Sequence, residues 1–285
     1  LDEYNNVFFN VGYISKAPRF NNVYDYSNQL FRDIRNEQVK AVEGGYSYRS
    51  SLLSANVNGY YTIWENKPAN GGVTVMVDDV PFKANINGMN ALHKGVEMDF
   101  ALKINHQFSI EGLLSLGDWR WTSSDTARFL DDDNNPVMIN DTTELIAPFD
   151  AEGVHVGDAA QTQYGLSVRY EPTPNSYFKL RGTYFDNYYA DFDPLSLNGE
   201  NAGRESWKIP SYQLIDLHAG YKFKLWDKNK LDLKLSVLNL LDKMYISDAQ
   251  NNDPYNASYQ DFDAKSAGVF FGLGRRFNIS AKFTF

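Results

Sequence analysis

The sequence predicts an all-β protein, an antiparallel up-and-down transmembrane β-barrel with about ten strands. Three observations support this fold class. Apolar and polar side chains alternate over long stretches, as they do in strands that have two different faces. The connecting segments are alternately short and long. The longest apolar runs, such as residues 268–271, fall far short of the roughly 20 residues that a membrane-spanning helix needs.

The composition of the 285-residue chain narrows the class further. Hydrophobic residues make up 43%, too many for a disordered chain at a formal net charge of −9. The lack of cysteine excludes a disulfide scaffold and a thiolate metal site. The acidic balance argues against nucleic acid as a partner, since its phosphates require a basic face. Because the chain starts at Leu1 without a signal-peptide pattern, we expect a processed product or an excerpt of a longer protein.

Alternation with a period of two residues defines the expected strands. In the last ten residues, Ile279, Ala281 and Phe283 form one face, and Ser280, Lys282 and Thr284 form the other. The same pattern predicts strands at residues 53–64, 96–104 and 215–224, and weaker copies at 6–14, 39–50, 107–121, 163–172, 176–189 and 229–239. A short helix is also expected near residues 29–37, where apolar residues share one helical face.

The connections decide between two architectures. Short turns are expected at residues 49–51, 105–107, 172–175 and 226–229, and long polar loops at 14–38, 65–92, 122–162, 190–211 and 241–267. Long loops at one end and short turns at the other are typical of an outer-membrane barrel. Only helices and closed barrels pair every backbone group within a bilayer, and the sequence offers no candidate for a membrane-spanning helix. A soluble β-sandwich is the less favoured alternative, because its strands are shorter and it turns at both ends.

The polar faces of the strands carry charges that would line the barrel lumen. Two roles are open for them: the cations could form a stripe that attracts an anionic ligand, or they could pair with the acidic residues or with a domain inside the lumen. Pairing is the favoured role. The candidate lumen charges are Glu97, Asp99, Glu111, Arg169, Lys179 and Arg181.

Aromatic residues mark a candidate ligand site at the extracellular mouth. Trp64, Trp119, Trp121 and Tyr189 are expected to point inward at the upper ends of their strands, and Trp207 lies in a long loop. Aromatic rings in this position can stack on sugars or on aromatic siderophores. An inner rim that packs against loops is an equally open interpretation.

Motifs for catalysis or for a cofactor are not found, so we expect neither an enzyme nor a cofactor. The run from Asp131 to Asp133 resembles the start of a calcium loop, but Pro136 and Thr142 occupy the positions that require glycine and glutamate. A solvated acidic loop is therefore favoured over a calcium site at Asp131 and Asp133. His218 is expected to hydrogen-bond in the lumen.

Five segments, taken in order, resemble TonB-dependent receptors. Residues 9–24 are similar to the family's "SYSRGFRAPSLNELY", and residues 93–99 to its "RxxGVELE". Residues 235–245 are close to "LxVxNLFDKxY", with Leu241 in place of the phenylalanine. Residues 36–46 resemble "NPDLKPEKSDNYELGL", although Ala41 and Val42 interrupt the "KPE". Residues 277–285 are similar to the aromatic-ended last strand of outer-membrane proteins.

The resemblance implies a receptor in the bacterial outer membrane. Such receptors have an N-terminal plug domain inside a barrel of about 22 strands, preceded by a segment that contacts TonB. Residues 1–285 would be the C-terminal portion of that barrel, without the plug and the first strands. The implied partners are outer-membrane lipid, the TonB complex through the N-terminal region that is absent from this sequence, and a small-molecule or glycan ligand.

The expected function is import of a scarce nutrient, such as a siderophore, cobalamin or an oligosaccharide, with energy relayed by TonB. A passive porin-like barrel, or a small barrel complete in itself, is the alternative.

Overall fold

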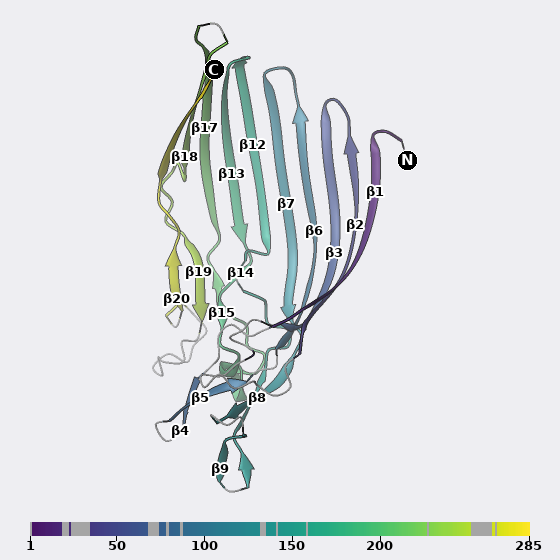
Figure 1. Cartoon of the computed structure of the whole chain (residues 1–285), viewed down its shortest axis with the longest axis vertical. Coiled ribbons are helices and arrows are strands. Elements are labelled where there is room, and N and C mark those ends of the chain that lie inside the picture. Colours follow the sequence, from purple (N-terminus) through teal and green to yellow (C-terminus); the bar gives the residue numbers. More distant parts are fainter. Residues whose placement is uncertain are drawn as a thin grey trace.

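The structure is a computed structural model that describes residues 2–18, 23, 35–67, 74–77, 80–85, 88–131, 135–140, 142–157, 159–226, 228–251, 264–265 and 267–285. Its main element is a sheet of ten antiparallel strands in the order β1-β2-β3-β6-β7-β12-β13-β17-β18-β21. Each strand pairs with the next sheet strand along the chain, as in an up-and-down barrel wall (Figure 1).

The ten strands coincide with the ten that the alternation predicts. Most are 11 to 15 residues long, enough to cross an apolar band of about 25 Å when tilted. Their bounds are β1 (Asn5–Lys16), β2 (Glu37–Arg49), β3 (Leu53–Lys67), β6 (Met89–Lys103), β7 (Phe108–Trp121), β12 (Thr162–Thr173), β13 (Ser176–Asp186), β17 (Tyr212–Lys224), β18 (Lys230–Leu238) and β21 (Arg276–Thr284).

Two boundaries and one helix differ from the sequence expectations. Strand β6 starts at Met89, seven residues before the expected 96, because pairing with β3 continues beyond the clear alternation. Strand β13 ends at Asp186 rather than at 189, because Asn187 adopts a left-handed φ of 49° that breaks the extended backbone. Of the helix expected at 29–37, residues 29–34 lie outside the described part, and Glu37 begins β2.

All connections follow the expected order, with short turns at one end of the sheet and long loops at the other (Figure 1). Because all ten strands lie in one sheet, the two packed layers of a sandwich are not formed by them. Strands β1 and β21 are the two edges of the sheet and do not pair with each other, so the ten strands form an open wall and not a small closed barrel. Among the described residues, no helix is long and apolar enough to cross a membrane.

The two faces of the wall differ in polarity. On one face, which we call the outer face, large apolar side chains remain exposed in strand after strand. In β1, for example, Phe9, Val11 and Tyr13 are each more than 60% exposed. On the inner face many of the alternating partners are polar or charged, among them Glu43, Glu97 and Asp99, as in the lumen of a barrel. The outer face is the apolar surface that the sequence predicts to meet lipid.

The long loops carry their own short strands and a packed core. The loop at 122–161 holds β8 (Ser124–Leu130), β9 (Met138–Asn140), β10 (Thr143–Glu144) and β11 (Ile146–Asp150), and β8 pairs with β5 (Val80–Asn85), which in turn pairs with β4 (Thr74–Val77). The loop at 187–211 holds β14 (Tyr188–Tyr189), β15 (Asp191–Phe192), β16 (Lys208–Ile209) and the short helices η2 (Pro194–Ser196) and η3 (Gly199–Asn201). The last loop holds β19 (Ile246–Asn251) and β20 (Gly268–Phe271).

We call residues 122–161 and 187–211 together the loop cap. Side chains from both segments bury one another and the loop-side ends of β6 and β7. Phe149, Val154 and Val156 of the first segment meet Phe192 and Leu197 of the second. From the wall this cluster includes Met89, Ala91 and Trp121. The cap is thus a folded unit that is packed on the wall.

Candidate functional site

A cluster of rings lies on the inner face at the loop-side ends of β3, β6 and β7. The His93 ring lies between two indoles, with centroids 6.2 Å from Trp64 and 5.5 Å from Trp119. The Trp119 Nε1–H donates a 2.8 Å hydrogen bond to the Tyr60 hydroxyl. Cross-strand pairing brings these residues together, because Thr62, His93 and Trp119 are register partners on neighbouring strands.

Lys67 and Trp121 extend this arrangement toward the loop cap. The Lys67 ammonium lies 5.1 Å from the ring centroid of Trp64 and 4.9 Å from that of Trp121, within the range of cation–π attraction. The Trp121 ring meets Phe192 of the cap edge-on, with centroids 6.4 Å apart. We call Tyr60, Trp64, Lys67, His93, Trp119 and Trp121 the mouth cluster.

Two donors of the mouth cluster have no acceptor among the residues that the structure describes. The indole nitrogens of Trp64 and Trp121 are buried and have no hydrogen-bond partner in the described part of the chain. A buried N–H without an acceptor is uncommon and costs free energy. A ligand that brings acceptor oxygens beside the rings would relieve this cost.

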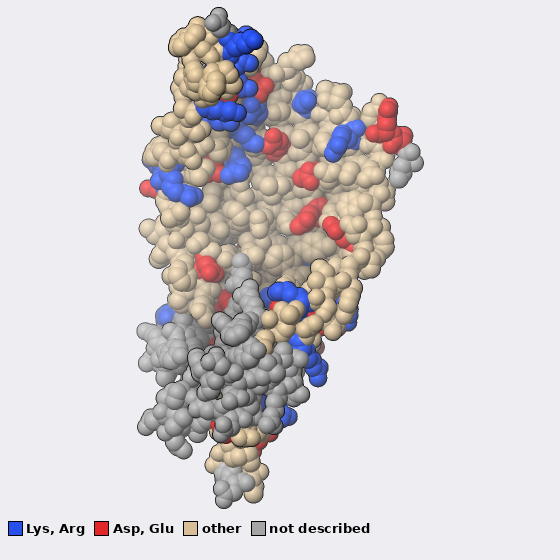
Figure 2. Space-filling model, viewed as in Figure 1, with Lys and Arg blue, Asp and Glu red and all other residues tan. Residues whose placement is uncertain are grey.

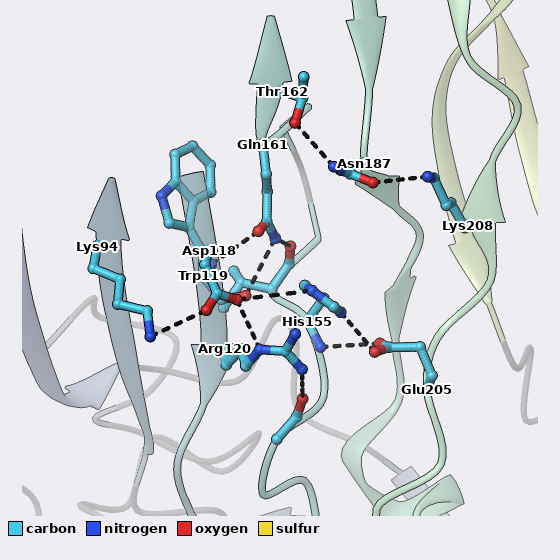
Figure 3. Close-up of polar contacts among 12 residues, drawn as sticks. Lys94, Asp118, Trp119, Arg120, His155, Gln161, Thr162, Asn187, Glu205 and Lys208 are labelled. Atoms are coloured by element: carbon cyan, nitrogen blue, oxygen red, sulfur yellow. Dashed lines mark hydrogen bonds and ion pairs between the residues drawn. The ribbon is translucent and has the colours of Figure 1, made fainter. Parts of the chain in front are cut away.

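A polar network occupies the opposite face of β7 (Figure 3). Because successive side chains in a strand alternate, Asp118 and Arg120 lie on the face opposite Trp119 and Trp121. The Arg120 Nε lies 2.7 Å from Asp118 Oδ1, and the Lys94 Nζ lies 3.2 Å from Asp118 Oδ2. Arg120 also donates through Nη1 to the carbonyl oxygen of Gly153, 2.8 Å away, which connects the wall to the loop cap.

Residues 153–156 of the cap continue the hydrogen-bonding pattern of β7 beyond the end of β12. The amide of Trp121 donates to Val154 O, and the amide of Val156 donates to Trp119 O. His155 forms a β-bridge with Arg120, so its side chain shares the outer side with Arg120. Val154 and Val156 point the other way, into the core of the cap.

Gln161 fixes the junction between the cap and the wall (Figure 3). Its side chain is 1% exposed. The Oε1 accepts from the Trp119 amide at 2.8 Å, and the Nε2 donates to the carbonyls of Trp119 and Val156 at 3.2 and 3.1 Å. One buried side chain thus satisfies backbone groups on both sides of the junction.

The structure unites three of the expected mouth residues and separates two. Trp64, Trp119 and Trp121 lie together in the mouth cluster, as the sequence predicts. Tyr189 does not point inward: it stacks on His155 at 4.0 Å between ring centroids, on the outer side. The expectation was wrong because it extended the strand through Asn187. Trp207 lies in the expected loop and packs on a second core of the cap, which includes Tyr188 and Ile209.

The lumen cations are paired, which is the favoured one of the two expected roles. Lys179 Nζ lies 2.5 Å from Glu111 Oε2. Arg181 pairs with Asp216 at 2.5 Å rather than with the acids proposed for it. Arg169 pairs with Glu171 at 2.7 Å, and its guanidinium lies 4.0 Å from the ring centroid of Tyr177.

The lumen acids of the N-terminal strands have amide partners instead. Asn56 donates to Asp99 at 2.8 Å, and Asn58 donates to Glu43 at 2.6 Å. Glu97 is the register partner of Asn58 on β6. Lys and Arg gather toward the C-terminal strands of the visible face and Asp and Glu toward the N-terminal strands (Figure 2). Cations are therefore more frequent toward the C-terminal strands, where Glu171 and Asp216 pair with two of them.

No group of acidic residues and histidines in the described ranges has the arrangement of a metal site. Asp131 Oδ1 accepts from the amide of Asn135 at 2.8 Å and so closes a local turn. Asp133 lies outside the described residues. His218 Nδ1 lies 2.9 Å from Ser236 Oγ, a lumen hydrogen bond of the expected kind.

Sequence reasoning missed Tyr60, Lys67 and His93 in the mouth cluster. Tyr60 and His93 have inward parity on strands that were recognised, so the parity that selected the tryptophans could have found them. It also missed His155 and Glu205, because the loops that hold them have no periodicity that would place them.

The open wall of up-and-down antiparallel strands, with long loops at one end, has the architecture of part of a large β-barrel. The family model "TonB dependent receptor-like, beta-barrel" matches residues 1–240, and the chain belongs to this family. A search of curated protein sequences returns no match.

Solved structures of similar fold include three transport proteins. They are the copper transporter OprC (14% identity, TM-score 0.62, 99% of this chain and 38% of that one), the ferric yersiniabactin uptake receptor FyuA from Yersinia pestis (16%, 0.60, 100% and 36%) and the siderophore receptor PiuA from Acinetobacter baumannii (16%, 0.58, 99% and 34%). At these identities the likeness shows the fold. The chain spans about a third of the length of each structure.

Proposed function

We propose that this chain is the C-terminal part of the barrel of an outer-membrane transport receptor. The complete protein would bind a scarce nutrient at its extracellular mouth and import it with energy relayed by TonB. The family membership supports the class, and the similar structures include receptors named for siderophore uptake and a copper transporter. The observation that carries the proposal is the mouth cluster, placed on the inner face next to a packed loop cap.

The ligand class follows from the chemistry of the mouth cluster. Indole rings offer stacking surfaces to planar or sugar ligands. The two indole N–H groups that find no acceptor in the described ranges, together with the nearby ammonium of Lys67, favour a ligand with acceptor oxygens. A siderophore, cobalamin or an oligosaccharide would each supply such groups.

Trp64, Trp119 and Trp121 are the proposed ligand contacts. Trp207 and Tyr189 would act through the cap, because their contacts lie in its cores and not in the mouth cluster. Lys179 and Arg181 are paired with acidic residues. This pairing reduces the positive charge that would attract an anionic ligand along the wall.

Calorimetric titration of the complete purified protein tests the site. The probes are a ferric catecholate, cobalamin and a maltooligosaccharide. We expect saturable binding of one probe and a loss of about tenfold in affinity on Trp119→Ala, which corresponds to about 1.4 kcal/mol. Trp226→Ala is the matched control, because Trp226 is 68% exposed next to a short turn at the other end of the wall. Equal losses in both variants would contradict the placement of the site.

Energy coupling is tested separately by uptake. Cells that lack TonB should bind the accepted probe at the surface but should not accumulate it. Uptake at an unchanged rate in such cells, together with steady conductance of the protein in planar bilayers, would favour the passive porin-like alternative.

A further inference from the structure

Basic side chains gather on the visible face at the turn-side ends of the last strands of the wall (Figure 2). Residues two apart in a strand share a face, and the register places five lysines on the inner face that also carries His218 and Ser236. All five side chains are exposed. We call these residues the lysine patch: Lys222 and Lys224 of β17, Lys230 and Lys234 of β18, and Lys282 of β21.

The lysine patch concentrates positive charge. Lys224 lies directly opposite Lys230 in the register of β17 and β18. Like charges that face each other across two strands destabilise the pairing of those strands. The same strand ends hold one acid on the inner face, Asp232, which is the register partner of both Lys222 and Lys282. Five lysines against one aspartate leave an excess of positive charge on three neighbouring strands.

Cations nearer the middle of the same face have acidic partners. Lys179 pairs with Glu111, and Arg181 pairs with Asp216. By contrast, no side chain of the lysine patch forms an ion pair or a hydrogen bond within the part of the chain that the structure describes. The wall thus supplies anions to its central cations and leaves the lysine patch without them.

We propose that the lysine patch is the docking surface for an acidic protein segment inside the barrel, which belongs to the complete protein outside residues 1–285. The carboxylates of that segment would neutralise the excess charge and relieve the repulsion between the lysines. This partner rests on the proposed function, in which residues 1–285 are one part of a longer receptor.

Two considerations favour a segment of the same protein over a small anion. The similar structures are much longer than this chain, which spans 34–38% of each, so most of such a protein is available to face the patch. A small anion contacts one or two flexible lysines at a time, whereas carboxylates fixed on one segment engage several lysines together and bind more tightly for that reason.

The lysine patch lies far from the proposed ligand site. The mouth cluster is at the loop-side end of the wall, and the patch is at the turn-side end (Figure 1). Docking at the patch would therefore hold the segment in the lumen without covering the mouth cluster. Because ion pairs between exposed groups are screened by salt, this contact could be released without breaking a packed core.

Zero-length cross-linking of the complete protein in nanodiscs tests the docking. A carbodiimide joins a lysine amine to a carboxyl group where the two are in contact, and peptide mass spectrometry identifies both residues. We expect links from the lysine patch to aspartates or glutamates outside residues 1–285. Normalised to the Lys179–Glu111 link, their yield should fall about threefold or more between about 10 mM and 1 M NaCl, because the Debye length falls from about 30 Å to about 3 Å.

Removal of part of the lysine patch should weaken the contacts of the rest. In the double variant Lys222→Gln and Lys282→Gln, links from Lys230 and Lys234 should fall about fivefold. Lys103→Gln is the matched control, because Lys103 is an exposed lysine at the turn-side end of β6 whose register partner on β7 is a serine. This control should leave the links unchanged. Near-UV circular dichroism checks that each variant is folded.

Several outcomes overturn the proposal. They are an absence of links, links only to acids within residues 1–285, links to a different protein, and unchanged links from Lys230 and Lys234 in the double variant. The cross-links form without ligand and without TonB. They can therefore fail while calorimetry still finds the ligand site, and the ligand site can fail while the cross-links form.

Discussion

The wall and the loop cap are held together by different means. Backbone pairing along ten strands joins the wall, which leaves its large apolar side chains exposed on the outer face. The cap has short strands of two to seven residues and buries Phe129, Phe149 and Leu197 at 3% exposure or less. A sheet that faces lipid needs no core of its own, whereas loops in water need one. A substitution that opens a cavity should therefore destabilise the cap more than the wall, and an introduced charge should destabilise the wall more than the cap.

The largest effect is expected for a cavity in the cap. Leu197→Ala should lower the free energy of local opening by about 2–5 kcal/mol, because Leu197 is 1% exposed and its neighbours cannot fill the space. Hydrogen exchange of the Asp150 amide, which donates to Leu197 O, reports this opening. Leu166→Ala on the outer face of β12 is the control, and lipid would fill its space. Equal losses of stability in the two variants would contradict the idea that only the cap depends on a packed core.

An introduced charge should be tolerated in the loop cap and should destabilise the outer face of the wall. Leu166→Arg places a cation near the middle of the outer face and should cost about 2–4 kcal/mol in folding into lipid, measured by urea titration in vesicles. Ile139→Arg, at a 62% exposed position of β9 in the cap, should change stability by less than about 0.5 kcal/mol. A mild effect of Leu166→Arg would argue against lipid at this face.

The junction between the regions depends on buried hydrogen bonds. Gln161→Ala leaves the backbone groups of Trp119 and Val156 without their partner and should cost about 1–3 kcal/mol. Gln163→Ala removes one partly buried bond to Ala160 O and should cost less. The hydrogen-exchange rate of the Val156 amide distinguishes the two variants. Equal rates in both would show that Gln161 does not hold the loop cap on the wall.

The smallest effect is expected in the lumen. The Glu111–Lys179 pair is partly exposed, with side chains 48% and 24% accessible, so its coupling energy should be about 0–1 kcal/mol. A double-mutant cycle with Glu111→Gln and Lys179→Met measures it. A coupling of several kcal/mol would mean that the wall relies on side chains as the cap does.

The wall could be predicted from the sequence because each strand has one apolar and one polar environment. Its apolar and polar residues therefore alternate with a period of two. Inward placement of Trp64, Trp119 and Trp121 followed from the same parity. The parity failed at Tyr189, because one left-handed residue, Asn187, ended β13 three residues early. A single asparagine in a strand gives no sign of such a change.

The cap could not be predicted, since its core joins residues far apart in the chain without a repeating pattern. Phe149 and Leu197 belong to two loops whose sequences show only an excess of Asn, Asp, Gly and Pro. His155 and Glu205 meet for the same reason, 50 residues apart. Even on the wall, the partner of Arg181 was missed, because its choice of Asp216 depends on the register between β13 and β17.

The central claim is that one sheet separates lipid from water, and β13 allows the most direct measurement. Residues 1–285 contain no cysteine, so single cysteines at residues 177–183 can carry a nitroxide label with no competing thiol in this part of the protein. In nanodiscs, accessibility to oxygen should peak at Phe178 and Leu180, and accessibility to a water-soluble nickel chelate at Lys179 and Arg181. An oscillation with a period of two residues, in opposite phase for the two probes, is the predicted result. Equal access of the nickel chelate to both faces would contradict the account.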